Sequence, residues 1–264
     1  MIDFMKGGAV QTADRSTIEW TDSTWNPTTG CSRISPGCEN CYAEVFARRL
    51  QRMGVPRYSN GFEPTLHDDA LSLPLKWKKP RKIFVNSMSD LFHERIPSDF
   101  IDRVFDTIRA APQHIYQILT KRPYLMKRYS ERVGGFPEQV WAGVSIENSH
   151  YKFRIDHLRG VGAFVKFVSI EPLLGPIGEL DLDDIDWVIV GGESGTNFRP
   201  VDPNWIREVR DQCVMKRIPF FFKQWGGITS KAGGRTLDGK QWSQLPRARN
   251  RFNGMRTVEC SVIE

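Results

Sequence analysis

Six short, nearly continuous runs of apolar, β-branched and aromatic residues recur along this 264-residue chain, and amphipathic stretches lie between them. Runs that are apolar at successive positions, rather than at alternate ones, are typical of strands buried on both faces of a parallel sheet. The six predicted strands cover residues 82–90, 114–121, 139–148, 164–172, 186–194 and 219–227. Residues 18–27 would supply a first strand ahead of them.

Helical patterns separate these runs, and we expect helices over residues 41–53, 98–111, 122–133, 149–160 and 202–217. Ser98 is a candidate N-cap, Asp202 another with Pro203 at the first helical position, and Gly160 a stop signal. Residues 173–185 are too short and acidic for a helix prediction. Repeated strand–helix units indicate an α/β fold, specifically a complete or partial (β/α) barrel of six to eight units with an extra C-terminal tail. An open doubly wound sheet is the alternative.

The chain divides into three predicted regions. Residues 1–17 form an N-terminal extension, residues 18–227 the barrel with a basic insertion at 54–81, and residues 228–264 a basic tail. No run of about 18 apolar residues indicates a membrane span, and the N-terminus shows no apolar signal segment. The odd count of five cysteines suits a reducing compartment, so we expect a cytoplasmic protein.

Three of the cysteines, Cys31, Cys38 and Cys41, lie within eleven residues directly after the first predicted strand, with the spacing C-x6-C-x2-C. A structural zinc site would need a fourth ligand, such as Cys213, Cys260 or a histidine. A nucleophilic cysteine would not require three thiols. A [4Fe–4S] cluster held by three thiolates would keep one iron open for a small molecule. We favour the cluster, and zinc remains the alternative.

Polar side chains follow each predicted strand, where the chemistry of barrel enzymes is carried out. Glutamates recur at three successive strand ends and lysines at two more, whereas turns alone would favour Asn, Asp and Gly. The candidate residues at these ends are Ser87, Ser89, Asp90, Lys121, Ser145, Glu147, Asn148, Glu171, Gly192, Glu193 and Lys223. We expect an apolar wall below them, made of Phe84, Ile118, Val144 and Val190.

This arrangement resembles the radical S-adenosylmethionine superfamily, in which a three-cysteine loop follows the first strand of a (β/α) barrel. The usual spacing there is C-x3-C-x2-C, so the resemblance is to a variant. A closer resemblance, over about residues 17–245, is to a phage and mobile-element family of unknown function. The segments that carry it are TWNPTTGC, PGCENCYAE, PLKWKKPRKIFVNSMSDLFH, ILTKRP, VWAGVSIEN, SIEPLLGP, VIVGGESG and FFKQWGG.

The resemblance implies that Cys31, Cys38 and Cys41 hold a [4Fe–4S] cluster to which S-adenosylmethionine binds. Once reduced by an electron donor, the cluster would cleave the sulfonium and release a 5′-deoxyadenosyl radical that takes a hydrogen atom from substrate. The aromatic residue that commonly precedes the last cysteine is replaced by Asn40, and Tyr42 follows it instead. The implied cofactor contacts are Tyr42, Ser87, Ser89, Asp90, Ser145, Glu147, Asn148, Gly192 and Glu193. From their positions at strand ends, rather than from the resemblance, Lys121, Glu171 and Lys223 are the candidate catalytic residues.

Basic segments raise the question of a nucleic-acid partner. The net charge is +6, and residues 75–82 form a dense basic run around Trp77. The tail carries further cations and an aromatic residue: Lys240, Trp242, Arg247, Arg249, Arg251 and Arg256. Phosphate contacts with interleaved aromatic residues have this composition, and so do solvated loops. A non-enzymatic, zinc- or cluster-bearing nucleic-acid-binding protein is therefore the second functional hypothesis. Among the histidines, His114 is expected to be a packed or surface residue, and His93 to lie near the site.

Overall fold

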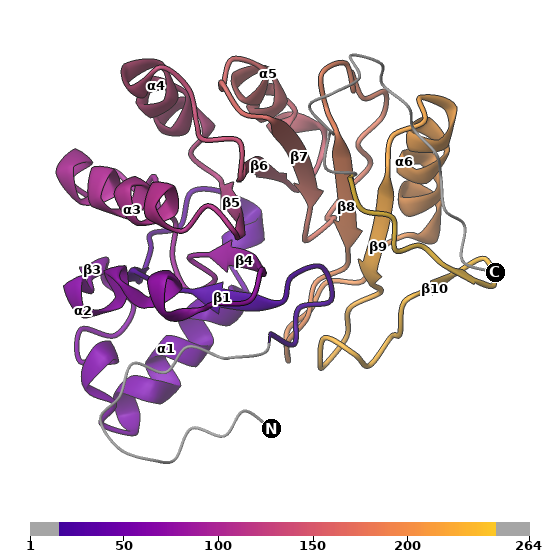
Figure 1. Ribbon diagram of the computed structural model, residues 1–264. Coiled ribbons are helices and arrows are strands. Elements are labelled where there is room, and N and C mark those ends of the chain that lie inside the picture. Colours follow the sequence, from indigo (N-terminus) through magenta and orange to yellow (C-terminus); the bar gives the residue numbers. More distant parts are fainter. Residues whose placement is uncertain (1–15, 247–264) are drawn as a thin grey trace.

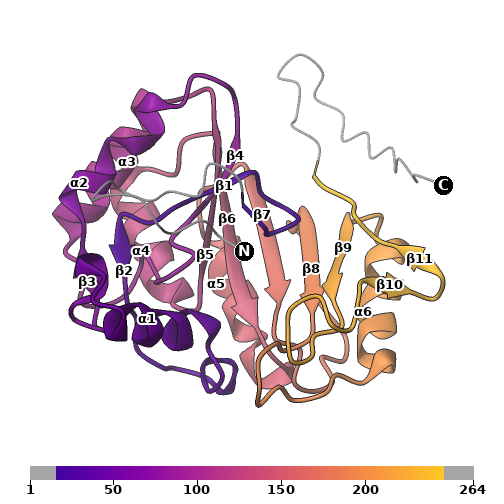
Figure 2. The ribbon, with the colours of Figure 1, turned by 90° about the horizontal axis from the view of Figure 1, so that it is seen from below.

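Seven parallel strands form one curved sheet in this computed structural model, which describes residues 16–246 (Figures 1 and 2). Their order across the sheet is β1-β4-β5-β6-β7-β8-β9, the same as along the chain. A doubly wound sheet would reverse its order at a switch point, so this alternative is excluded. In the described part of the chain β1 and β9 do not pair, and the fold is a partial (β/α) barrel. The strands are β1 (Ser23–Trp25), β4 (Lys82–Val85), β5 (Ile115–Thr120), β6 (Val140–Ile146), β7 (Val165–Ile170), β8 (Trp187–Gly191) and β9 (Phe220–Gln224).

Helices cover the outer side of this sheet, where α3, α4, α5 and α6 form an arc around the strands (Figure 1). The α-helices are α1 (Tyr42–Arg52), α2 (Asp68–Leu71), α3 (Ser98–Ala110), α4 (Pro123–Val133), α5 (Phe153–Arg159) and α6 (Pro203–Met215). Short 3-10 turns are η1 (Pro36–Cys38), η2 (Pro56–Tyr58), η3 (Leu73–Lys76) and η4 (Ser149–Tyr151). The connection from β7 to β8 contains no helix, as its acidic sequence indicated.

Two of the three helix-boundary predictions are confirmed. The Asp202 carboxylate accepts a hydrogen bond from the backbone N–H of Asn204 at 2.8 Å, and α5 ends just before Gly160. The prediction for Ser98 is wrong, because Ser98 is already the first helical residue and Pro97 holds the N-cap position. The fixed φ of proline favours the extended backbone (φ −62°, ψ 143°) that an N-cap requires.

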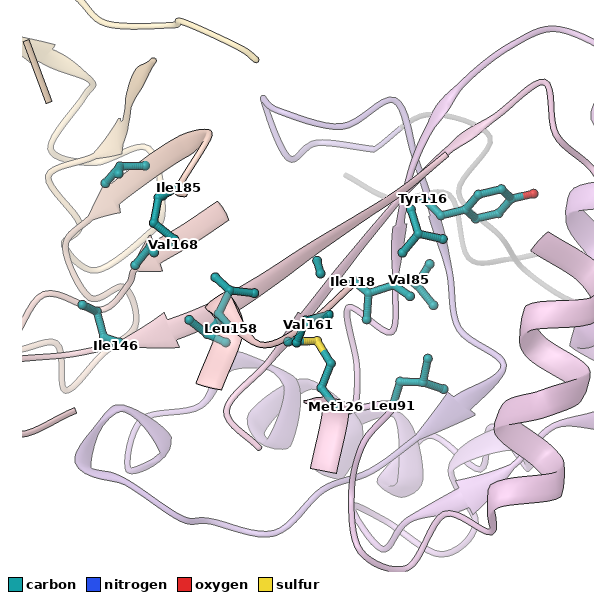
Figure 3. Packing of buried hydrophobic residues seen from close by; sticks show 14 of the residues in the cluster. Val85, Leu91, Tyr116, Ile118, Met126, Ile146, Leu158, Val161, Val168 and Ile185 are labelled. Carbon is teal, nitrogen blue, oxygen red and sulfur yellow. The ribbon is translucent and has the colours of Figure 1, made fainter. Parts of the chain in front are cut away.

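The outer face of the sheet and its helices share the main hydrophobic core. Figure 3 shows part of this layer, with Ile118 and Val168 from the sheet, Met126 from α4 and Leu158 from α5. Ile118, Val144 and Val190 all belong to it, so the prediction that they wall the site is wrong. Side chains alternate between faces along a strand, and these three point away from the barrel interior.

The inner face carries a second cluster, which consists largely of aromatic rings and includes Phe84 as expected. The Phe167 ring lies directly over Gly143, where an added Cβ would come within 2.3 Å of it. Glycine at this position therefore leaves space for the ring. The other buried members are Trp20, Trp141, Val165, Trp187, Ile189 and Phe221. These rings fill the barrel interior below the carboxyl ends of the strands.

The basic run around Trp77 lies at the amino-terminal edge of the sheet, since it leads directly into β4. Trp77 is buried against His114, with ring centroids 6.1 Å apart, and the Arg81 guanidinium covers its ring at 4.9 Å. This aromatic side chain is a core residue and cannot stack on a base. Of the two positions expected for His114, packed or on the surface, the structure shows the packed one.

The described part of the tail folds back onto β9. A hairpin of β10 (Thr236–Leu237) and β11 (Lys240–Gln241) leads to Trp242, whose carbonyl accepts a hydrogen bond from the Phe222 N–H at 2.9 Å. The Lys240 ammonium lies 4.9 Å from the Trp242 ring centroid. Arg247, Arg249, Arg251, Arg256 and Cys260 lie outside the described residues. No helix within residues 16–246 is long and apolar enough to cross a membrane.

Candidate functional site at the carboxyl edge of the sheet

The cysteine loop, residues 30–42, begins where β1 ends and lies at the carboxyl edge of the sheet. β2 (Thr28–Thr29) pairs with β3 (Thr65–Leu66) from the insertion. Gly30 then forms an isolated β-bridge with Ser89, which follows β4 in the chain. At Gly30 the backbone has φ +84°, and an added Cβ would lie 2.2 Å from the Glu63 carbonyl oxygen. The insertion therefore fixes the start of the loop.

Arg122, at the end of β5, anchors the first cysteine. Its Nη1 donates to Cys31 Sγ at 3.4 Å and to Asp90 Oδ2 at 3.2 Å, while Nη2 donates to Ser32 Oγ at 2.8 Å. The fourth partner is Glu94, which accepts from Nε at 2.7 Å. Such a buried guanidinium, with all its contacts in one plane, holds the loop in a single orientation.

His93 supports the same segment, in agreement with its expected place near the site. Its Nε2 lies 2.8 Å from Ser32 Oγ, and its Nδ1 accepts from the backbone N–H of Arg95 at 3.0 Å. Burial and the nearby Arg122 cation lower the pKa of His93, which favours a neutral ring that donates through Nε2. Although burial opposes it, the hydrogen bond from Arg122 lowers the pKa of Glu94 to about 2.

Glu147, at the end of β6, holds the middle of the loop. It is fully buried, its Oε1 accepts from Ser35 Oγ at 2.6 Å, and Lys121 Nζ lies 3.3 Å away. Its Oε2 accepts from Arg154 Nη1 at 3.1 Å. Gly37 packs on this side chain so closely that an added Cβ would lie 2.7 Å from Glu147 Cγ. A buried carboxylate is stable here because two cations and a hydroxyl compensate it.

Glu193, which follows β8, holds the far end of the loop. Its Oε2 accepts from Asn40 Nδ2 at 3.1 Å, and Arg199 pairs with it through two side-chain nitrogens at 2.6 and 2.9 Å. Burial opposes ionisation, but these donors lower the pKa of Glu193. Arg199 also donates to the Pro36 carbonyl at 2.9 Å, so one ion pair contacts both arms of the loop.

The residues after β4 close the arrangement from the opposite side. The Tyr42 hydroxyl donates to the Ser87 carbonyl, which connects the residue after Cys41 to the segment after β4. Ser87 Oγ donates to Asn26 Oδ1 at 3.2 Å, and Ser89 Oγ donates to the Thr28 carbonyl at 2.8 Å. These two serines therefore tie β4 to the start of the loop.

Asp90 is occupied by four protein donors. Thr120 Oγ1 and the Phe92 N–H donate to Oδ1 at 2.7 and 3.0 Å, and the Lys121 N–H and Arg122 Nη1 donate to Oδ2, each at 3.2 Å. In this arrangement Asp90 orients Arg122, and through it Cys31.

Two ion pairs lie on the inner face, at the carboxyl edge of the sheet. Lys121 pairs with Glu147, and Lys223 Nζ with Glu171 Oε1 at 2.5 Å. Lys223 and Glu171 are 17% and 21% exposed, so this pair faces the barrel mouth. Ser145 is buried near the end of β6, two positions before Glu147, and its carbonyl accepts from Arg154 at 2.7 Å.

Gly192 and Asn148 have local structural roles in this geometry. An added Cβ on Gly192 would lie 2.0 Å from the Trp225 carbonyl oxygen, so β8 and the end of β9 approach too closely for any side chain. The Asn148 side chain accepts from the His150 N–H at 3.0 Å and caps η4. The structure gives neither residue a contact with the cysteine loop.

Cys31, Cys38 and Cys41 are free and half-buried, and burial raises the pKa of Cys31 to about 12 and that of Cys41 in the same direction. Ser35 Oγ lies 3.8 Å from Cys38 Sγ. Within residues 16–246, no three Cys, His, Asp or Glu side chains converge closely enough to hold a metal ion. In type and number, however, three unpaired thiols on one loop match the ligands that iron–sulfur clusters take.

The zinc alternative lacks a fourth ligand among these residues. Cys213 is buried in α6 within the main core, where burial raises its pKa to about 12. His67 Nε2 lies 2.8 Å from Thr29 Oγ1, and both nitrogens of His93 have partners. The donor set therefore fits a three-thiolate cluster better than a tetrahedral zinc site.

The arginines of the site are what the sequence reasoning missed. Arg122, Arg154 and Arg199 are all absent from the candidate residues that the sequence predicted. Arg154 is almost fully buried, and an arginine needs an acidic partner in that environment. Its position as the second residue of α5, opposite a strand-end glutamate, gives no periodic signal.

Fold and site together define a partial-barrel α/β protein with a three-thiol loop held at the mouth of the barrel. The chain belongs to DUF5131, a family of proteins of unknown function, whose model matches residues 15–246. This match confirms that the chain belongs to a family of unknown function. A comparison with curated proteins gives no match.

Solved structures of spore photoproduct lyase are similar to this chain. The lyase complexed with dinucleoside spore photoproduct shows 12% sequence identity and a TM-score of 0.43, with 75% of this chain covered. A single-residue variant of the lyase shows 13% identity, a TM-score of 0.47 and 77% coverage. A variant with bound AdoMet and dinucleoside spore photoproduct shows 12% identity and a TM-score of 0.43. The chain spans 64% of the length of these lyase chains.

Proposed function

We propose that this protein is a radical S-adenosylmethionine enzyme that modifies a nucleotide or nucleic acid. Cys31, Cys38 and Cys41 would hold a [4Fe–4S] cluster. When bound and reduced, the cluster supplies the electron that cleaves S-adenosylmethionine to methionine and a 5′-deoxyadenosyl radical. The observation that carries the proposal is the convergence of contacts from the ends of β4, β5, β6 and β8 on the cysteine loop.

The residues around the loop supply positioning and shielding. Arg122 donates to Cys31 Sγ, and hydrogen bonds to ligand sulfur atoms tune the potential of a cluster. The aromatic floor of Trp141, Phe167 and Trp187 excludes water from below, which protects a radical from side reactions. Tyr42 and Ser87 lie on the β4 side, where they would contact the cofactor.

Lys121, Glu171 and Lys223 are proposed as the residues that meet substrate. Lys223 and Glu171 lie at the mouth in mutual contact, so each can hold or move a proton at Lys223 Nζ or Glu171 Oε1. Lys121 offers an ammonium beside Glu147, suited to a carboxylate or phosphate. Glu193 and Ser145 complete the polar ring above the aromatic floor.

The test is anaerobic purification and reconstitution, followed by reduction with dithionite in the presence of S-adenosylmethionine. We expect a brown protein with bound iron and sulfide, which forms 5′-deoxyadenosine and methionine detectable by chromatography. The Cys38→Ala variant, treated identically, should form neither. A protein with a full cluster that forms no 5′-deoxyadenosine, with or without added DNA or RNA, would refute radical chemistry. A colourless protein with bound zinc would favour the zinc alternative.

A further inference from the structure

Four rings form a row across the adjacent helices α4 and α5. Tyr124 and His157 have ring centroids 5.9 Å apart, His157 and Phe153 6.3 Å, and Phe153 and Tyr151 6.3 Å. Tyr124 is 55% exposed and Phe153 50% exposed. Most other rings of the described chain are buried, so two half-exposed rings in one row are an unusual surface feature.

This row lies on the same side of the molecule as the site. Tyr124 comes two residues after Arg122, which contacts Cys31, and Phe153 comes six residues after Glu147, which contacts Ser35. Both helices start at the carboxyl edge of the sheet and lie next to each other (Figure 1). A polymer bound along the row would therefore pass close to the barrel mouth.

Cations lie beside the row. The exposed guanidinium of Arg128 lies 5.8 Å from the Tyr124 ring centroid. The guanidinium of Arg154 lies 4.5 Å from the Tyr151 ring centroid, but it is buried and pairs with Glu147, so it supports this ring and is not offered to a phosphate. Lys152 and the exposed His150 precede Phe153. The acidic side chains on these two helices are paired, Asp156 with Arg159 at 2.6 Å and Glu131 with Lys127 at 3.7 Å. The charge around the exposed rings is thus complementary to a polyanion.

We propose that this aromatic row, Tyr151, Phe153, His157 and Tyr124, binds single-stranded nucleic acid and presents it to the barrel mouth. Exposed ring faces accept unpaired bases by stacking, and flanking cations contact the phosphates. A single strand fits better than a duplex, because the bases of a duplex are not free to stack on protein rings. The presenting role rests on the proposed function, whereas binding itself does not.

The experiment measures binding of fluorescein-labelled oligothymidylate to the full-length protein, as purified, by fluorescence anisotropy. Tyr124→Ala and Phe153→Ala should each weaken binding about tenfold, because stacking of one base on an aromatic ring contributes roughly 1–3 kcal/mol. Tyr124→Phe and Phe153→Tyr should bind like the wild type, since the ring remains. Arg128→Gln should lower the slope of log affinity against log salt by about 1.

Matched controls come from the opposite parts of the surface. Met215→Ala removes an exposed apolar side chain of α6, and Lys78→Gln removes a cation from the amino-terminal edge of the sheet. Neither variant should change the dissociation constant more than about twofold, which corresponds to about 0.4 kcal/mol. Thermal unfolding of each variant checks that the fold is retained.

Two results would overturn the proposal: a wild-type protein that does not bind the oligonucleotide, or alanine variants that bind it as tightly as the wild type. Preference for a duplex, unaffected by Tyr124→Ala, would also overturn it. Because anisotropy needs neither reductant nor S-adenosylmethionine, binding is scored separately from radical chemistry. Binding without 5′-deoxyadenosine formation would refute the proposed function only.

Discussion

The guanidinium of Arg122 donates to the sulfur of Cys31 at 3.4 Å, across 91 positions of sequence. The same guanidinium contacts Asp90, Glu94 and Ser32, so the first cysteine of the loop is attached to a buried ionic network. The network fixes one end of the loop to the end of β5.

Arg122→Lys tests whether this hydrogen bond tunes the proposed cluster. Lysine keeps the charge but cannot satisfy Asp90, Ser32 and the sulfur at once. We expect bound iron to remain and the midpoint reduction potential to become more negative, because a donor to the sulfur stabilises the reduced state. A redox titration followed by electron paramagnetic resonance measures this. An unchanged potential, equal to that of the Arg132→Lys surface control, would contradict the role given to Arg122.

The three loop cysteines should act as one ligand set. Cys31→Ala, Cys38→Ala and Cys41→Ala should each lose most of the bound iron, because a cluster with two thiolates is poorly held. Cys213→Ala should retain it, since Cys213 lies in the core of α6. Iron and sulfide analysis of anaerobically prepared protein gives the answer. Loss of metal in the Cys213 variant would instead support a four-ligand site.

Glu147→Gln should destabilise the fold as well as the site. The change removes the carboxylate that compensates Arg154 and Lys121, and a buried cation left without its partner costs about 3–5 kcal/mol. Urea denaturation measures the loss. The matched control is Asp106→Asn, which breaks an exposed pair with Arg109 and should cost less than about 1 kcal/mol. Equal losses in the two variants would show that Glu147 is not an internal anchor.

His67 should make the protein less stable in mild acid. Burial, together with the nearby Arg57 cation, lowers the pKa of His67 to about 4, below the value of about 6.5 in an unfolded chain. Between these values the unfolded state binds more protons, so the free energy of unfolding falls as the pH drops from about 6.5 to about 4. Across this pH range, protonation of His67 should lower the free energy of unfolding by about 3 kcal/mol.

The variant His67→Gln isolates this effect. Glutamine cannot be protonated, so its free energy of unfolding should decline less across the same pH range, by about 3 kcal/mol relative to the wild type. Urea denaturation at several pH values provides the comparison. Parallel curves for the two proteins would mean that folding does not lower the pKa of His67.

Strand existence and order followed from the sequence because buried parallel strands leave a local signal. Each continuous apolar run, such as residues 164–172 around β7, contains its strand within it. The local cap at Asp202 was equally readable, since a capping side chain bonds to an N–H two residues away. The glutamates and lysines at strand ends were also found, because they directly follow these apolar runs in the sequence.

What the sequence could not show depends on pairs far apart in the chain. The contact of Arg199 with Pro36 spans 163 positions, and no periodicity encodes it. The sequence also did not show which face of the sheet a strand residue occupies. Ile118 and Val144 were expected to line the site, but they point to the outer face, toward the helices. Trp77 similarly resembles a stacking residue in a basic run, yet it is buried against His114.

The contact between Gly37 and Glu147 has a consequence for how related sequences can diverge. The backbone of Gly37 does not need glycine for its conformation, so only the volume of the Glu147 side chain keeps position 37 without a side chain. Substitutions at the two positions should therefore be inherited together. Relatives with a shorter residue at position 147 are free to carry alanine or serine at position 37, whereas those that retain the glutamate are not.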